Sequence, residues 1–88
     1  MEFYCMAQLS DKRLNQLKES IPKIVGLRIK ELRNERGLTQ TELAELVGKD
    51  RQYLYKIEKG RVTPNVVTIS ALVYALEISL TDFFDFKI

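Results

Sequence analysis

The stretch LTQTELAELVGKDRQYLYKIEKG, from Leu38 to Gly60, constrains the fold of this chain more than any other feature. An apolar pattern with helical spacing stops at Gly48, and a second helical pattern begins three residues later. Ala44 is small where two such helices must cross closely, and glycine at position 48 permits a turn with positive φ. The stretch therefore predicts two short helices, about 40–47 and 51–59, packed across each other.

Capping residues and apolar spacing predict helices on both sides of this pair. Thr39 with Glu42 forms the pattern of a capping box, Asp50 and Asn65 suit the starts of the next two helices, and Ser79 with Asp82 repeats the box. The expected helices outside the pair span about 11–20, 23–36, 65–77 and a short end after 79. No segment has the pattern of a strand. The prediction is an all-α fold of five helices with an extra N-terminal helix.

Pro22 is expected to separate that extra helix from the rest, because proline disfavours helical geometry in the residue before it and suits the first turn of a helix. Residues 1–22 are thus predicted to be an N-terminal extension, in which Leu14 and Leu17 share one face. Residues 23–88 are predicted to be the main domain. Its expected core comprises Val25 or Ile24, then Ile29, Leu32, Leu43, Ala44, Val47, Leu54, Ile57, Val66, Ile69, Leu72, Val73 and Leu76.

Composition excludes several classes of function. With 88 residues, 45% hydrophobic and 30% charged, the chain has the balance of one small folded domain. The single cysteine, Cys5, cannot form an internal disulfide, and without histidine there is no metal-binding cluster and no usual acid–base catalyst. No cofactor, metal, small-molecule ligand or enzymatic activity is therefore expected.

The N-terminal sequence MEFYCMAQL does not have the pattern of a secretion signal. It carries an acidic residue where a signal peptide has basic ones, its apolar run is broken by Gln8, and no small-residue cleavage site follows. No apolar run approaches the roughly 20 residues that span a bilayer. The expectation is a cytoplasmic protein without a membrane partner.

Positive charge is concentrated in the middle of the chain. Residues 23–61 contain ten basic and six acidic side chains, whereas residues 62–88 contain one basic and three acidic ones. Residues 1–22 are balanced, with three of each. The split predicts a middle segment that faces an anion and a C-terminal segment that packs.

The second helix of the pair offers a polar outer face. If Leu54 and Ile57 anchor it, the side chains left outside belong to Arg51, Gln52, Tyr55 and Lys56. A helix-turn-helix unit presents such a face to the major groove of DNA, where Arg pairs with guanine and Gln with adenine. These four residues are the predicted base readers. Predicted contacts to the DNA backbone come from Gln40, at the start of the preceding helix, and from Lys49, Lys59 and Arg61.

Residues 24–84 closely resemble the phage-repressor-like helix-turn-helix family, of Cro/cI or Xre type. The pieces that carry the resemblance are RIKELR, GLTQTELA, YLYKIEKG, TP and LEISLTDFF, in that order. The resemblance implies a five-helix DNA-binding domain, usually a homodimer on a palindromic operator, that regulates transcription. The resemblance also implies that Gln40 contacts DNA near a phosphate and a base. It implies that the four outward residues of the second helix read the bases.

The resemblance also implies a structural ion pair between Arg33 and Glu58. Tyr53 is larger than the residue often found at its position, and a backbone phosphate is the predicted partner of its hydroxyl. Residues 1–23 have no counterpart in the minimal domain, and their helical part either covers the core or exchanges between subunits.

The aromatic C-terminus predicts a contact between copies. Phe83, Phe84 and Phe86 are hard to bury together in one small monomer, so they are the predicted dimer interface. Other readings stay open for some features: one or more of these phenylalanines in the core, a tyrosine of the second helix packed on its neighbours, and the Arg51 and Lys56 cluster as a solvated face. For the whole chain, the alternatives are an ordinary helical hairpin, and a protein-interaction module or antitoxin-like, partner-dependent regulator.

Overall fold

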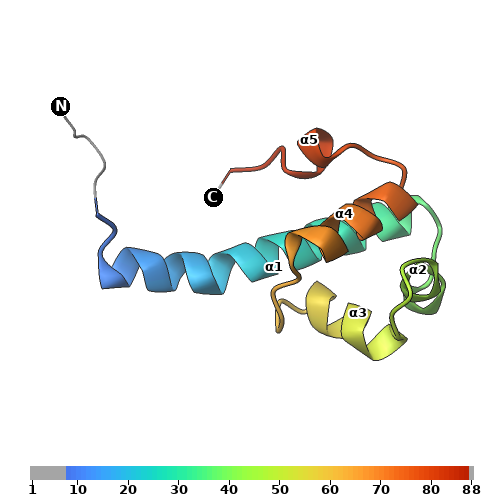
Figure 1. Cartoon of the computed structure of the whole chain (residues 1–88), viewed down its shortest axis with the longest axis horizontal. Helices are drawn as coiled ribbons and strands as arrows, with labels where there is room; N and C mark the ends of the chain where they lie inside the picture. Colours follow the sequence, from blue (N-terminus) through green and yellow to red (C-terminus); the bar gives the residue numbers. More distant parts are fainter. Residues whose placement is uncertain (1–7, 88) are drawn as a thin grey trace.

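The computed structural model describes residues 8–87, which form five helices (Figure 1). Their bounds are α1 Asp11–Glu35, α2 Gln40–Leu46, α3 Arg51–Glu58, α4 Val66–Ala75 and α5 Leu80–Phe83. Across 8–87 no residue is in a strand, and the predicted all-α fold is confirmed. The first seven residues, which include Cys5 and part of the predicted extension, lie outside the described residues.

Every helix begins at a side-chain cap. Thr39 forms a complete capping box, in which its hydroxyl accepts from Glu42 N at 3.0 Å and Glu42 Oε1 accepts from Thr39 N at 2.8 Å. The Thr39 backbone N–H, and after it the Thr39 hydroxyl, interact with the charged carboxylate of Glu42 and lower its pKa. At Ser79 only the hydroxyl half of the predicted box is present, accepting from Asp82 N at 3.0 Å. The remaining helices begin at Ser10, Asp50 and Asn65.

The predicted break at Pro22 is wrong. α1 runs unbroken for 25 residues with Pro22 inside it, and the proline ring is buried. Proline removes one backbone hydrogen bond from a helix interior and crowds the carbonyl four residues earlier. Here the burial of the ring, and a helical apolar pattern that continues on both sides of it, offset that cost. The extra N-terminal helix is therefore the first half of α1, and the boundary predicted at residue 22 does not coincide with an end of a helix.

The core contains buried side chains from all five helices, and α5 closes it at one side. Val66 was expected in it but is 75% exposed, because it directly follows the cap Asn65 and starts α4 on its outer side. Glycine at position 26 brings α1 close to α3, since a Cβ there would collide with the carbonyl oxygen of Ile57. The buried hydrophobic residues are Val25, Ile29, Leu32, Leu43, Ala44, Leu54, Ile57, Ile69, Leu72, Val73, Leu76 and Phe83.

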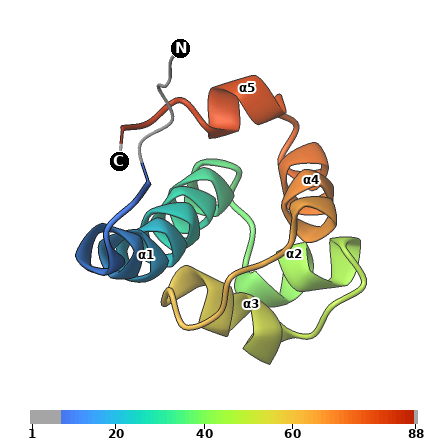
Figure 2. The same ribbon diagram turned by 60° about the vertical axis from the view of Figure 1, so that its left-hand side comes forward.

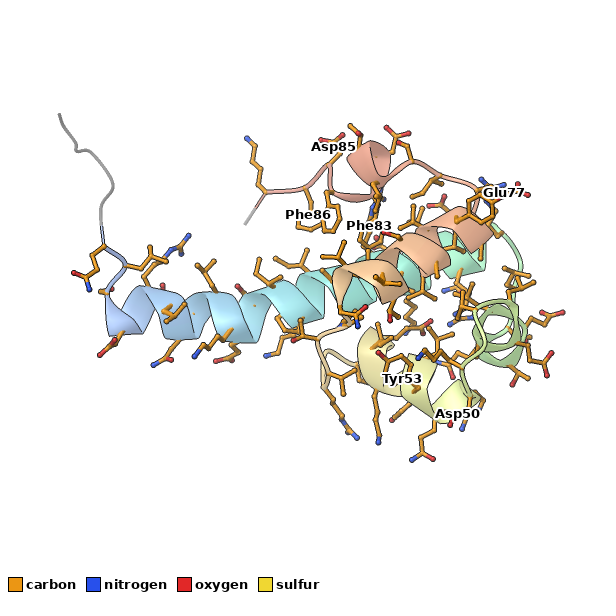
Figure 3. The ribbon with its side chains drawn as sticks, viewed as in Figure 1. Asp50, Tyr53, Glu77, Phe83, Asp85 and Phe86 are labelled. Atoms are coloured by element: carbon orange, nitrogen blue, oxygen red, sulfur yellow. The ribbon has the colours of Figure 1, made fainter. Side chains whose placement is uncertain are left out.

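Phe83 is a core residue with 0% exposure, in contrast to its predicted place at a dimer interface. Two hydrogen bonds hold α5 against α1, from Arg28 Nη2 to the carbonyl oxygen of Asp82 at 2.9 Å and from Arg28 Nε to that of Phe83 at 3.3 Å. Figure 3 shows the side chains of Phe83 and Phe86 directed from this end of the chain toward α1. The anchored backbone aims Phe83 inward, which leaves it no surface for a partner.

Candidate nucleic-acid interface

α2 and α3 form the two helices of a helix-turn-helix unit at one end of the bundle (Figure 2). Gly48 has φ 71° in the turn between them, and Lys49 N donates to the carbonyl oxygen of Ala44 at 2.9 Å, which closes the end of α2. Asp50 then caps α3 by accepting from Tyr53 N at 2.8 Å. The turn is thus defined by one glycine and two short hydrogen bonds.

The outer face of α3 carries the predicted base readers. Leu54 and Ile57 are each 1% exposed and fix the inner face of the helix. The opposite face leaves Arg51, Gln52 and Lys56 exposed and Tyr55 partly exposed. α3 lies along the outside of the bundle in both views, below α1 (Figures 1 and 2). The outer face of α3 is therefore accessible from solvent along the length of the helix.

A chain of hydrogen bonds runs from the interior to this face. Arg33 Nε and Nη2 donate to Glu58 Oε2 and Oε1 at 2.7 and 3.0 Å, and Arg33 Nη1 donates to the carbonyl oxygen of Leu38 at 2.8 Å. The side chains of Arg33 and Glu58 are only 11% and 3% exposed. The implied ion pair therefore exists as a bidentate, desolvated contact that ties α1 to α3.

Gln40 continues the chain to the surface. Its Nε2 donates to Glu58 Oε1 at 3.0 Å, and its Oε1 accepts from Arg51 Nη1 at 2.9 Å. A carboxylate accepts and a guanidinium only donates, so these two partners set the orientation of the Gln40 amide. One edge of Arg51 is held, and its other N–H groups stay free to meet an external acceptor.

Cations flank α3 at both ends, resting against its tyrosines. Lys49 Nζ lies 5.3 Å from the ring centroid of Tyr53, before the helix. Lys59 Nζ and Arg61 Cζ lie 5.6 and 5.8 Å from the ring centroid of Tyr55, after it. The Tyr53 ring is partly buried against the core. Three of the residues predicted to meet the DNA backbone, Lys49, Lys59 and Arg61, are thus placed at the two ends of the helix that carries the predicted base readers.

Two residues of α1 that were not predicted belong to this surface. A hollow of about 310 Å³ in front of α3 is lined by Leu27, Lys30, Gln40, Arg51, Tyr55, Glu58 and Lys59. Lys30 is exposed and adds a cation beside the residues of the helix-turn-helix unit. Lys30 lies here because α1 crosses α3 at Gly26, and no local sequence pattern predicts that crossing. The hollow joins polar and positive groups from three helices.

Two other features, a metal-binding cluster and a membrane-spanning helix, are absent from residues 8–87. No group of three or more potential metal-ligating side chains gathers in that part of the chain. The helices in the same range include none with the length and apolar character needed to cross a membrane.

The helix-turn-helix family HTH_3 matches residues 29–83, more than half of the chain. The chain belongs to this family. The match confirms the resemblance to Cro/cI- and Xre-type regulators, and it identifies a DNA-binding transcriptional regulator of repressor-like type that is not an enzyme. The matched segment begins in the second half of α1 and ends at the last residue of α5.

Named relatives agree with the family. The chain is 44% identical over 57 residues to an uncharacterized HTH-type transcriptional regulator, y4dJ, of Sinorhizobium fredii, covering 65% of this chain and 74% of the relative. It is 46% identical over 57 residues to the immunity repressor protein of Bacillus phage phi105, covering 65% of this chain and 40% of the repressor. The structure is also similar to the restriction–modification controller protein C.Esp1396I, solved as a tetramer with its natural 35-base-pair operator. The TM-score is 0.70 at 30% identity, over 75% of this chain and 87% of the controller.

Proposed function

We propose that this protein is a homodimeric regulator that reads an inverted-repeat operator through α3. The observation that carries the proposal is the hydrogen-bonded chain from Arg33 through Glu58 and Gln40 to Arg51. It holds a guanidinium in place at the N-terminal end of an exposed helix, which is the end that lies nearest the base edges in a major groove. Preorganisation of this kind lowers the cost of ordering the side chain when DNA binds.

Each predicted residue then has a role in the complex. Arg51, Gln52, Tyr55 and Lys56 face the bases, where Arg and Lys suit guanine and Gln suits adenine. Gln40, Lys49, Tyr53, Lys59 and Arg61 meet the phosphates on either side, joined by Lys30 from α1. Such a division predicts sequence choice from α3 and salt-sensitive affinity from its flanks. The proposed location is the cytoplasm, where binding to DNA would associate the protein with the nucleoid.

Support for a dimer comes from two sources. The C.Esp1396I controller binds its operator as more than one copy. In this chain Phe84 is 46% exposed and Phe86 partly exposed, with the Phe84 ring centroid 4.9 Å from that of Phe83 and 5.9 Å from that of Phe86. A small aromatic surface anchored on the core suits a contact between copies. Two α3 helices about 34 Å apart would then reach successive turns of one face of the duplex.

The test is a selection from a randomised duplex library at moderate salt. Enrichment of an inverted repeat with one fixed half-site spacing is the expected result. One position of each half-site should favour guanine with the wild-type protein and lose this preference with Arg51→Ala. Isolated half-sites without fixed spacing would exclude the dimeric reading. Weak, salt-sensitive binding with no enriched sequence would exclude sequence-specific regulation by this chain alone.

A second candidate is a regulator that needs a protein partner. The observation that favours it is an open hollow of about 780 Å³ lined by Leu46, Val47, Ala71, Tyr74, Ala75, Glu77 and Ile78. Leu46 and Tyr74 on its wall are 62% and 86% exposed, which is unusual for large apolar side chains that lie together. Under this reading Tyr74→Asp would abolish operator binding in cell extract, whereas the purified wild-type chain would bind weakly.

A further inference from the structure

α1 presents two opposite sides to the rest of the bundle. Gly26 lies against α3, and Arg28, two residues later, donates to the backbone of α5. Two residues correspond to about 200° around a helix, so these contacts mark opposite sides of α1. Both ribbon views agree, with α3 below α1 and α5 above it (Figures 1 and 2).

An apolar stripe follows the α5 side of α1 toward its N-terminus. Leu14, Leu17, Ile21 and Ile24 are spaced by three, four and three residues, which is the spacing of a coiled-coil seam, and Arg28 is the next position of that repeat. Ile21 packs against the core, whereas Leu14 is 40% exposed and Leu17 is partly exposed. Among residues 8–87 no other helix lies beside this first half of α1 (Figure 1).

The charges that border the stripe distinguish two ways of pairing it with itself. With Leu14 at position a of the repeat, Arg13 is at position g, and Asp11 and Lys18 are at positions e. In a parallel pair, position g of one helix faces position e of the other, so Arg13 would lie beside the partner's Lys18 and the two cations would repel each other. In an antiparallel pair with Leu14 opposite the partner's Leu17, the positions e meet. Asp11 then lies beside the partner's Lys18, and symmetry repeats this ion pair. The sequence complements itself only in the antiparallel arrangement.

We infer that the first half of α1 is a contact for a second copy of this chain, with the two helices antiparallel and Leu14 packed on the partner's Leu17. Residues 11–21 form about three turns, roughly 16 Å of helix, which is less than a standard interface needs. The contact is therefore weak alone and strengthens when copies are held close together. It lies opposite α3, so paired copies keep both recognition helices uncovered.

The experiment exchanges the bordering charges and measures self-association by sedimentation in a concentration series without DNA. Phe84→Asp is the background, so that the proposed aromatic contact does not dominate. Asp11→Lys and Lys18→Asp should each weaken association about fivefold, because each breaks both symmetric pairs and adds repulsion. The double exchange should return the dissociation constant to within about twofold of the background chain.

Gln16→Asp is the matched control, because Gln16 lies two residues from Leu14 and on the far side of the helix. It should leave association unchanged, and circular dichroism melts should show that all variants fold. Equal association of the single and double exchanges, or a double exchange that fails to restore it, would overturn the antiparallel pair. Since no DNA is present, the result does not depend on whether the operator is an inverted repeat.

Discussion

At the scale of single residues, the proposed recognition of DNA depends on the link between a buried carboxylate and an exposed guanidinium. Glu58 accepts from Arg33 and from Gln40, and Gln40 in turn accepts from Arg51. A change at any member alters the position of the next one. The contribution of the whole hydrogen-bonded chain to stability is expected to exceed the sum of the effects of removing its members one at a time.

Arg51→Ala is expected to cost about 1–3 kcal/mol on the best operator and to relax sequence preference at one position. The cause is loss of a bidentate contact to a base, and competition binding with single-base operator variants measures it. Lys59→Ala is the matched control, because it also removes one cation at α3. It should weaken binding to all duplexes alike and reduce the slope of affinity against salt by about one. An equal loss on all sequences for Arg51→Ala would contradict base reading.

Arg33→Met is expected to lower the free energy of unfolding by about 3–5 kcal/mol, since it leaves the Glu58 carboxylate buried without its charged partner. Urea denaturation measures the change. The double variant Arg33→Met with Glu58→Met should recover most of the loss, because no charge then remains buried. Should the double variant be as unstable as the single one, the pair itself and not the isolated charge supplies the stability.

At the scale of helices, local signals were sufficient where a structure depends on neighbours in sequence. The caps Thr39, Asp50 and Asn65 were predicted because each bonds an N–H three residues away. Pro22 was misread because its place depends on burial, which a sequence window does not contain. The contact of Gln40 with Arg51 was equally hidden, because it requires the crossing of two helices.

The capping box of α2 gives stability a specific dependence on pH. Hydrogen bonds from Thr39 lower the pKa of Glu42. A carboxyl whose pKa is lower in the folded state stabilises the fold above its unfolded pKa, and this contribution is lost as the pH falls through the folded pKa. Glu42→Gln should therefore reduce the melting temperature at pH 7, and the difference from wild type should shrink in acid below the usual glutamate range. A difference independent of pH would assign the effect to packing instead of charge. Glu45→Gln, on the same helix but outside the box, is the control.

At the scale of the whole molecule, the C-terminal end divides its phenylalanines between two roles. Phe83 closes the core of one chain, while the neighbouring Phe84 stays 46% exposed. Sequence alone did not separate them, because three aromatic residues at a chain end look alike until Arg28 fixes the backbone of α5. Only the exposed member can be changed without opening the core.

Phe84→Asp is expected to give a folded chain that is monomeric by light scattering at micromolar concentration. The exposed side chain tolerates a charge, whereas two carboxylates facing each other across a symmetric interface repel. Binding to a full inverted repeat should fall toward the affinity for a single half-site, because the second α3 is no longer tethered. Binding to an isolated half-site should be unchanged, since α3 and its hydrogen-bonded support lie elsewhere.

Tyr74→Asp is the matched control for this variant, because it places the same charge on another exposed aromatic, 86% exposed on α4. It should remain a dimer and bind the inverted repeat as wild type does. If Tyr74→Asp is the monomeric variant and Phe84→Asp is not, the dimer forms through the outer face of α4. If both stay dimeric, neither aromatic residue carries the main contact between copies. The single exchanges Asp11→Lys and Lys18→Asp in the wild-type background then test whether α1 carries it, because each should weaken the dimer if it does.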